Sequence, residues 1–382
     1  MMYSCFSTLP LKRLMRPVSA GAVKIKGHLN DLADNDGFPG YSASGQDIRL
    51  PDYQFDTEGL VLSSVGAQCG KCFHATGKWG VVANTQPFMV TEKGHPRYLY
   101  YLVNQQDFWE KGGTAQPYVQ IPASISKAVP VPPLNTQRRI AQFLDEKTAR
   151  IDALIEKKHE LLDRLAEKRQ ALITRAVTKG LDSDVPMKPS GVEWIGEIPR
   201  HWGIVRLRWY LRTASGEGLR NVNIADERTE IDYATVIGGN GTMGFTDATN
   251  SEKAILVIGR VGAHCGNVHP IDEPSWITDN ALRVYDVRSF DRHYLLFTLR
   301  TCDLNRLASR NAQPLMTGET VKAQYLPCPP ISEQQAIGKE LEQSMSSLED
   351  TTDRINQSIQ VLFEYRSAVI SAAVTGQITE LI

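Results

Sequence analysis

The chain has 382 residues, of which 42% are hydrophobic, so it can bury the cores of at least two ordinary domains. Its formal net charge of −1 argues against a uniformly basic nucleic-acid coat, although a local basic patch can still bind phosphates. The six cysteines, the absence of a charged-then-apolar leader and the absence of a long uncharged apolar run predict a reduced, cytoplasmic protein with no membrane partner.

The sequence matches itself when it is shifted by 196 residues, and by 197 after one inserted residue. FPGYSASGQ near residue 40 aligns with ATVIGGNGT near residue 236, so that Gly45 falls on Gly241. The densest match places Gly66, Ala67, Cys69 and Gly70 on Gly262, Ala263, Cys265 and Gly266. Further matches are Asn84 with Asn280, Tyr98-Leu99 with Tyr294-Leu295, Ala115-Gln116-Pro117 with Ala312-Gln313-Pro314, Gln137 with Gln334, and Ala176-Val177-Thr178 with Ala373-Val374-Thr375. So many matches at one shift predict a duplicated chain.

Each copy is predicted to consist of a mixed domain followed by a long helix. The first part of each copy, roughly residues 1–131 and 189–328, contains Gly, Pro and short β-branched runs that indicate strands and turns. After Pro132-Pro133 and Pro329-Pro330, Gly and Pro become scarce for a stretch that corresponds to a helix of roughly 60 Å. The predicted boundaries are a first domain at 1–131, a helix at 132–181, a linker at 182–200, a second domain at 201–328 and a helix at 329–382.

Both helices show heptad spacing that is typical of a coiled coil. The first seam is predicted to contain Ile151, Leu154, Leu161, Leu165 and Leu172 and to continue through Lys158 and Lys168; the second is predicted to contain Leu348, Ile355, Leu362 and Val369, with Thr351, Ser358 and Tyr365 between them. The first helix is rich in basic residues and the second in acidic ones, so we expect them to pair with each other in antiparallel orientation, with the domains at opposite ends. The alternative is two ordinary amphipathic helices on separate domains.

The order of these parts resembles the specificity subunits of type I restriction-modification systems. PPLNTQRRIAQFLDEKTARIDALIEKKHELLDRLAEKRQALITRAVTKGLD resembles the central conserved helix of that family, and PPISEQQAIGKELEQ through AVTGQI resembles its C-terminal counterpart. GGNGTMGF, VIGRVGAHCGNV and ITDNALRV resemble a target-recognition domain, whereas the first domain departs from that pattern with SASGQD and VGAQCGKC. The first copy also has no counterpart of the long leader before Trp202, so we expect it to begin late.

The resemblance implies an α+β protein with two mixed α/β target-recognition domains, two long helices in an antiparallel coiled coil and internal pseudo-two-fold symmetry. It implies a non-catalytic subunit that binds a bipartite double-stranded DNA target, with one half-site for each domain and the helices setting the gap. Its implied partners are two DNA methyltransferase subunits, which would dock on the helices, and restriction-translocase subunits.

The sequence offers little evidence of catalysis. It contains no Walker-type phosphate-binding loop and no Asn-Pro-Pro-aromatic tetrapeptide of the kind that amino-methyltransferases use at a flipped base. No cofactor is expected. Cys69 and Cys72 could form half of a zinc site with His74 or His28, but no second C-x-x-C is present, and Val268 stands opposite Cys72. We therefore interpret Cys69 and Cys265 as small buried residues in Gly-flanked turns.

DNA contacts are expected from turn-rich loops that expose hydrogen-bond donors. Lys and Arg neutralise phosphates or pair with guanine, and Asn pairs with adenine in the major groove. The candidates are Ser42, Ser44, Lys71 and Lys78 in the first domain and Asn240, Thr242, Arg260 and Asn267 in the second. The alternative for these residues is a structural role in turns, or an ion pair in the case of Arg260. Two other functions remain open: an enzyme with its site between the domains, and a coiled-coil scaffold or anti-restriction decoy that occupies a methyltransferase.

Overall fold

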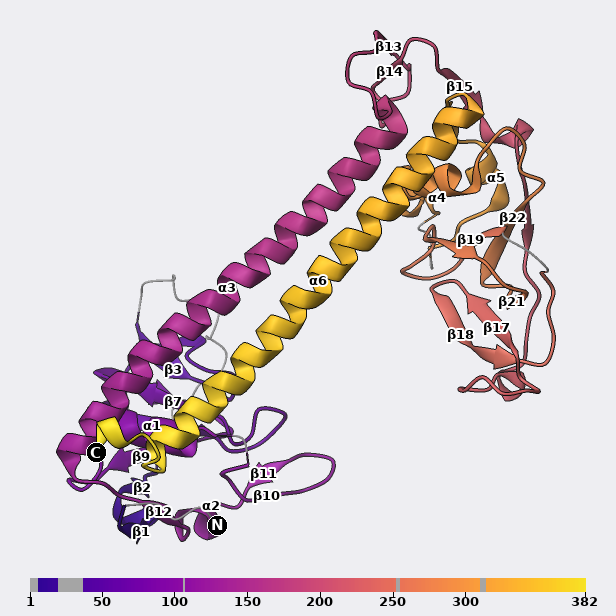
Figure 1. Ribbon diagram of the computed structural model, residues 1–382. Coiled ribbons are helices and arrows are strands. Elements are labelled where there is room, and N and C mark those ends of the chain that lie inside the picture. The colour runs from indigo at the N-terminus through magenta and orange to yellow at the C-terminus, as the bar shows by residue number, and fades with distance from the viewer. Residues whose placement is uncertain (1–5, 20–36, 106, 252–254, 310–313) are drawn as a thin grey trace. The chain divides into compact units, whose positions relative to one another are not determined.

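The computed structural model describes residues 6–19, 37–105, 107–251, 255–309 and 314–382, which form two compact units. Unit 1 comprises Met1–His159 with Asn356–Ile382, and unit 2 comprises Glu160–Ile355. The two long helices, α3 (Leu134–Lys179) and α6 (Ile331–Val374), each contribute one part to unit 1 and the other part to unit 2 (Figure 1). Both helices begin at the residue after a Pro-Pro pair, because proline is tolerated at a helix start and disrupts a helix interior. The two predicted long helices are therefore present.

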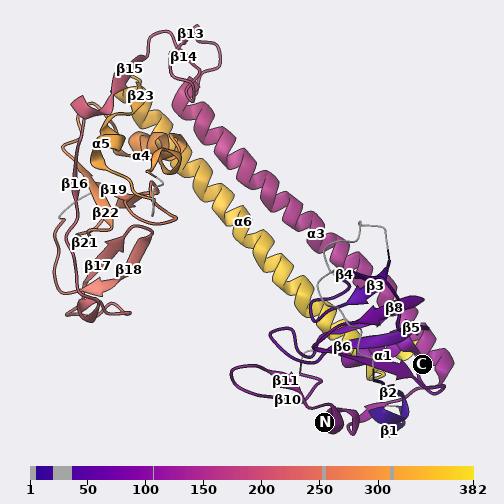
Figure 2. The same ribbon diagram turned by 180° about the vertical axis from the view of Figure 1, so that it is seen from behind.

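Unit 1 contains two four-stranded sheets, in the orders β2-β9-β6-β7 and β4-β3-β8-β5, and the two-stranded sheets β1-β12 and β10-β11 (Figure 2). β3 and β8 are parallel, and the other pairs are antiparallel. Its elements are β1 (Thr8–Pro10), η1 (Leu11–Arg13), β2 (Met15–Pro17), β3 (Phe38–Tyr41), β4 (Ile48–Leu50), β5 (Phe55–Asp56), β6 (Gly59–Ser63), β7 (Cys72–Ala75), β8 (Lys78–Val81), β9 (Thr85–Val90), α1 (Pro96–Val103), β10 (Lys111–Gly112), β11 (Tyr118–Val119), α2 (Ile121–Ile125), β12 (Ala128–Pro130) and η5 (Thr379–Leu381).

Unit 2 contains the sheets β16-β22-β19-β20, β18-β17-β21, β15-β23 and β13-β14. Its elements are β13 (Met187–Pro189), β14 (Glu197–Pro199), β15 (Gly203–Arg206), η2 (Leu207–Trp209), β16 (Arg212–Ser215), η3 (Asn221–Asn223), β17 (Ala234–Gly238), β18 (Gly241–Thr246), β19 (Ile255–Gly259), β20 (Val268–Ile271), β21 (Ser275–Ile277), β22 (Ala281–Tyr285), α4 (Arg292–Thr301), η4 (Leu304–Leu307), α5 (Gly318–Lys322) and β23 (Tyr325–Cys328). Three of these sheets repeat the strand order of unit 1, including the parallel pair, which is here β17 and β21. The predicted duplication of a mixed domain is therefore confirmed.

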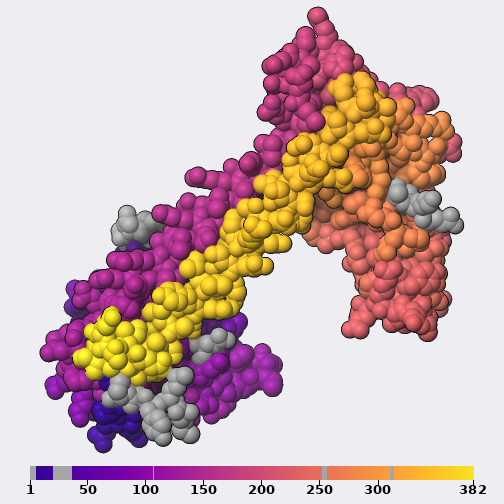
Figure 3. Space-filling view, viewed as in Figure 1, coloured from indigo at the N-terminus to yellow at the C-terminus, as the bar shows by residue number. Residues whose placement is uncertain are grey.

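The domain core in each unit continues into both long helices. In unit 1, residues of the β-sheets and α1 share a core with Ile140, Ala141 and Leu144 of α3 and with Ile370, Ala373 and Val374 of α6. In unit 2, the equivalent core includes Ile173, Ala176 and Val177 of α3 and Ile337, Leu341 and Met345 of α6. Early residues of one helix thus share a core with late residues of the other, so the helices run antiparallel within each unit. In unit 1 the C-terminal part of α6 also lies on the surface beside α3 (Figure 3).

Two buried tyrosines link the domains to the helix ends. The hydroxyl of Tyr98 lies 3.0 Å from the carbonyl oxygen of Pro130 and 3.2 Å from that of Val374. Tyr294 repeats this arrangement in unit 2, at 3.2 Å from Pro327 O and 3.0 Å from Val177 O. Burial raises the pKa of both phenols, which stay protonated and can donate. In each unit the tyrosine therefore reaches the C-terminal end of the helix that belongs to the other copy.

The helix seams are confirmed in type: Ile151 and Ile355 are buried as predicted, and four other predicted positions differ by one residue. Leu154 and Leu161 of α3 are 45% exposed, whereas Ile155 is 7% exposed and Leu162 is half-buried. In α6, Tyr365 and Thr351 are exposed, and the more buried positions are Thr352 and Ile359. Apolar residues are adjacent at 154–155 and 161–162, so heptad spacing alone could not decide which of each pair lies in the seam. Lys168 is also exposed and was wrongly placed on the seam.

The predicted attraction between a basic and an acidic helix is not how the helices are joined. Among the described residues, the ion pair that connects them lies in unit 1, where Arg366 of α6 contacts Asp152 of α3 at 2.8 Å. The acidic partner thus lies on the basic helix and the basic partner on the acidic one. Both side chains are partly exposed, so the pair contributes about 1 kcal/mol or less.

The segment at 182–200, which was expected to be a linker, contains the β13-β14 ribbon and packs on unit 2. Ile195 and Ile198 are buried in its core together with Trp202. The indole Nε1 of Trp202 donates to Glu333 of α6 at 2.9 Å, and the Nε2 of His201 lies 2.8 Å from the other oxygen of that carboxylate. The apolar residues of GVEWIGEIPRHW therefore fix the ribbon to the start of α6.

Candidate nucleic-acid interface

A tight loop with the same backbone occurs between β6 and β7 in unit 1 and between β19 and β20 in unit 2. Gly66 and Gly70 have φ of 99° and 96°, and Gly262 and Gly266 have φ of 85° and 87°, which favours glycine at all four positions. The same backbone hydrogen bonds recur: Gly66 N to Pro117 O, Cys69 N to Gly66 O and Gly70 N to Ser63 O match Gly262 N to Pro314 O, Cys265 N to Gly262 O and Gly266 N to Gly259 O. Cys69 and Cys265 are buried thiols within these loops, as predicted.

In unit 1 the structure brings three of the predicted residues close to this loop. Ser42 follows β3, where its hydroxyl donates to Asp47 at 2.6 Å and accepts from the backbone N–H of Ser44 at 3.0 Å. The next residue, Gly45, lies against the ring of Phe73, and Lys71 Nζ lies 5.5 Å from the centre of that same ring. Ser44 and Lys71 are exposed beside Phe73, while Ser42 builds the turn that holds Ser44.

Lys78 lies elsewhere in unit 1. It begins β8 and lies over the ring of Tyr53, at 4.6 Å from its centre, and near Phe38 at the start of β3. Because β3 and β8 are parallel, Lys78 is at the opposite end of this sheet from the turn that contains Ser42 and Ser44. A DNA contact by Lys78 would need a separate part of the surface.

In unit 2 the hairpin of β17 and β18 presents Asn240 at its tip and Thr242 as the second residue of β18. Gly238 pairs with Gly241, so Gly239 and Asn240 form a two-residue turn of a composition that is common in hairpins. An ideal Cβ on Gly241 would lie 3.7 Å from the ring of His269, which occupies the position of Phe73 at a shift of 196. Both Asn240 and Thr242 are exposed. The hairpin tip thus lies beside β20, next to exposed Asn267.

Arg260 follows β19 and combines a structural role with partial exposure. Its Nη1 donates to Ser215 Oγ at 2.9 Å and lies 3.4 Å from the carbonyl oxygen of Asp279. The expected ion pair is replaced by these neutral acceptors, so the positive charge of Arg260 has no carboxylate partner in the described part of unit 2. An ideal Cβ built on Gly239 would lie 3.8 Å from the backbone nitrogen of Arg260. Asn240, Thr242, Arg260 and Asn267 therefore lie on neighbouring loops of one domain.

The described residues contain neither a cluster of metal-binding side chains nor a membrane-spanning helix. No group of three or more His, Cys, Asp or Glu side chains that could hold a metal occurs among them, and His28 lies outside the described residues. Burial raises the pKa of the Cys72 thiol far above its usual range, which opposes metal binding as a thiolate. No described helix has the length and apolar character needed to cross a bilayer.

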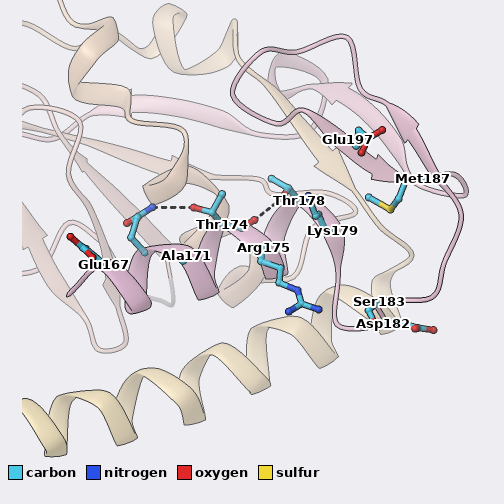
Figure 4. A pocket seen from close by; sticks show the side chains of 11 residues that line it. Glu167, Ala171, Thr174, Arg175, Thr178, Lys179, Asp182, Ser183, Met187 and Glu197 are labelled. Carbon is cyan, nitrogen blue, oxygen red and sulfur yellow. Dashed lines mark hydrogen bonds between the residues drawn. The ribbon is translucent and has the colours of Figure 1, made fainter. Parts of the chain in front are cut away.

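Unit 2 also has an open cavity of about 980 Å³ beside the last turns of α3. Figure 4 shows Thr174, Arg175 and Thr178 of α3 on one side and Met187 and Glu197 of the β13-β14 ribbon on the other. Within it, Gln170 Nε2 donates to Thr174 Oγ1 at 3.2 Å. Its walls are a helix face and a ribbon, and polar or charged side chains such as Gln170, Arg175 and Glu197 line it.

Comparisons with known proteins agree with the duplicated fold. The family model described as "Type I restriction modification DNA specificity domain" matches residues 26–164 and again residues 221–361. The chain is 29% identical over 104 residues to the EcoprrI specificity subunit of Escherichia coli, covering 27% of this chain and 26% of that subunit. It is 22% identical over 347 residues to the MjaVIII specificity subunit of Methanocaldococcus jannaschii, covering 84% and 79%.

A solved structure shows a similar fold over the whole length. Its title is "Structural basis underlying complex assembly and conformational transition of the type I R-M system", and it matches with a TM-score of 0.73 at 15% identity, covering 97% of both chains. The two matches of the family model fall on the two copies of the repeat and together cover more than half of the sequence. The chain belongs to the type I restriction-modification DNA specificity family.

Proposed function

We propose that this chain is the sequence-reading subunit of a type I restriction-modification complex, and that it binds an interrupted DNA target through one recognition domain for each half-site. The observation that carries the proposal is the repeated loop framework with different side chains. Ser44 stands where the second copy has Asn240, so the two loop tips offer different hydrogen-bonding groups. A duplicated catalytic site would need the same side chains twice, whereas two readers of different half-sites need different ones on the same backbone.

The chemistry is proposed to reside in partner subunits. Two methyltransferase subunits and the restriction-translocase subunits would assemble on this chain, with the long helices setting the gap between half-sites. The cavity beside α3 and exposed apolar side chains on the helices, such as Leu161, offer a surface for such partners. This role predicts that the purified chain alone methylates and cleaves nothing.

The test is to map methylated bases in cells that carry the chain and its neighbouring methyltransferase, with and without this chain. We expect an interrupted methylated motif that disappears when the chain is deleted. Methylation that is unchanged without the chain would contradict the proposal and leave a scaffold or decoy as the better account.

A second prediction concerns the hairpin tip of unit 2. Asn240→Ala should weaken discrimination at one or two base pairs of a single half-site by about 1 to 3 kcal/mol, because a bidentate amide contact to a base is lost. The measurement is binding to a panel of duplexes that carry single base changes across both half-sites. Asn356→Ala, at an exposed position of α6, is the matched control. If Asn240→Ala and Asn356→Ala discriminate equally between the duplexes, Asn240 does not contact a base.

A further inference from the structure

Each unit has a small cavity at the same place in its repeat. The cavity in unit 1 has a volume of about 240 Å³ and lies between the β6–β7 loop and the end of α1; the one in unit 2 has about 340 Å³ and lies between the β19–β20 loop and the end of α4. Residues related by a shift of 196 line both: Gly70, Lys71, Asn104, Asp107 and Trp109 in the first, and Gly266, Asn267, Arg300, Asp303 and Asn305 in the second.

The framework of the two cavities is the same although their side chains differ. Asp107 and Asp303 both adopt the left-handed backbone, with φ of 56° and 47°. The side chain at the helix end is tied to the same strand residue in both copies: Asn104 Oδ1 accepts from Cys72 N at 2.9 Å, and Arg300 Nε donates to Val268 O at 3.0 Å. The cavity is thus a feature of the fold that both copies keep.

In unit 1 the lining carries a net positive charge, because two lysines stand against the one carboxylate of Asp107. Lys71 and Lys111 line it, and neither ammonium group is paired with a carboxylate among the described residues. An ideal Cβ on Gly70 would lie 3.0 Å from Cε and 3.4 Å from Nζ of Lys111, so the absence of a side chain lets Lys111 lie over the loop. Two unpaired ammonium groups outnumber the single carboxylate of Asp107 around this polar cavity, and this excess of positive charge favours an anion.

In unit 2 the positive charge comes from the helix end. Burial and, second, the positive charge of Arg169 on α3 lower the pKa of Arg300, which still remains protonated. Burial and, second, the positive charge of Arg300 lower the pKa of His269. The described residues offer no carboxylate in ion-pair contact with Arg300, and the buried Nε2 of His269 has no hydrogen-bond partner among them. An anion at this cavity would offset the repulsion between Arg169 and Arg300.

The cavities adjoin the loops that carry the predicted base-reading residues. His269 lines the cavity of unit 2 and also contacts Gly241 of the hairpin, next to Asn240. In unit 1, Lys71 lines the cavity and lies over Phe73, which contacts Gly45, next to Ser44. In each unit, a side chain next to the cavity therefore also lies beside the tip of the loop that carries Ser44 or Asn240.

Resting on the proposed function, we propose that each cavity binds a phosphate group of the DNA backbone, through Lys71 and Lys111 in unit 1 and through Arg300 in unit 2. Phosphate contacts fix the register of a protein on DNA without reading its sequence. Holding a phosphate beside the loop tips would place Ser44 or Asn240 against the base edges of its half-site. Lys71 is then a positioning residue and not a base reader.

The experiment measures DNA affinity of the full chain, copurified with its methyltransferase, against salt between about 50 and 200 mM. The probes are a duplex with the target found by methylation mapping and a duplex of scrambled sequence. Lys71→Ala, Lys111→Ala and Arg300→Ala should each make the negative slope of log affinity against log salt less steep by about 0.9. Each variant should weaken binding to both duplexes by the same factor. Arg300→Lys should restore the slope.

Matched controls remove a positive charge at the other end of the same helices. Lys93→Ala, before α1, and Arg288→Ala, before α4, should leave the slope unchanged. If wild type prefers its target but the three cavity variants keep its slope, the phosphate sites are wrong and the proposed function stands. If the variants lose affinity for the target duplex only, these residues read bases, and the inference is overturned as well. If wild type shows no preference for the target, the proposed function itself fails. Thermal melting of each variant separates these outcomes from unfolding.

Discussion

Gln334→Ala is expected to lower the free energy of unfolding of unit 2 by about 3 kcal/mol, because it leaves three backbone groups without partners. Gln334 is fully buried at the start of α6. Its Oε1 accepts from the N–H of Asp291 at 2.8 Å, and its Nε2 lies 3.0 Å from Ser289 O and 2.9 Å from Pro329 O. Ser289 and Asp291 precede α4, so this side chain fixes α4 to α6. Calorimetric unfolding measures the effect.

The neighbouring glutamine is the matched control. Gln335 is exposed on the same turn of α6, and Gln335→Ala should change stability by about 0.5 kcal/mol or less. Equal stability of the two variants would show that the buried amide contributes nothing. Gln137 makes the equivalent contacts in unit 1, with His95 N at 2.7 Å, Lys93 O at 3.0 Å and Pro132 O at 2.9 Å. We expect the same loss in Gln137→Ala, and additive losses in the double variant because the two sets share no residue.

These paired glutamines show which part of the fold can be predicted from the sequence. The match of Gln137 with Gln334 at a shift of 197 indicated the duplication, and the Pro-Pro pairs predicted both helix starts. Ile151 and Ile355 were placed correctly in the seams, whereas Leu154 was not, because a choice between Leu154 and Ile155 depends on the position of the facing helix. The ribbon at 187–199 was missed because its Pro, Gly and Ser residues are typical of a connector, while its burial depends on contacts with Trp202 and Glu333.

The sequence predicted the loop residues of the candidate site. It did not predict the residues that reach these loops from distant parts of the chain. Asn240, Thr242, Arg260 and Asn267 were expected from turn composition, and the structure places them on neighbouring loops. Lys111 and Arg300 carry no such signal, because no spacing rule brings a residue onto Gly70 or Val268 from more than 30 positions away along the chain; Arg300 and Val268 are 32 positions apart. For Arg300 the one available signal was the repeat itself, since it stands where the first copy has Asn104 at the end of an equivalent helix.

Trp202→Ala should destabilise unit 2 by about 3 to 5 kcal/mol, the usual cost of removing a buried tryptophan. Its side chain is 1% exposed, and an ideal Cβ on Gly180 would lie 3.1 Å from its ring, so the indole fills the space between the end of α3 and the start of α6. Trp202→Phe keeps most of the volume and loses the hydrogen bond to Glu333, so about 1 kcal/mol is expected. Chemical denaturation with fluorescence of the other tryptophans as the signal measures both variants.

Trp209 supplies the control, because it lies in the same unit and is 75% exposed. Trp209→Ala should leave the unfolding free energy within about 0.5 kcal/mol of wild type. If Trp202→Ala were as mild as Trp209→Ala, the ribbon would not be anchored through the indole. The larger loss expected for Trp202 has a functional consequence, since its indole holds together one wall of the α3 cavity and the first turn of α6. A variant such as Trp202→Phe should therefore weaken assembly with partner subunits more than it weakens DNA binding by the loops of unit 2.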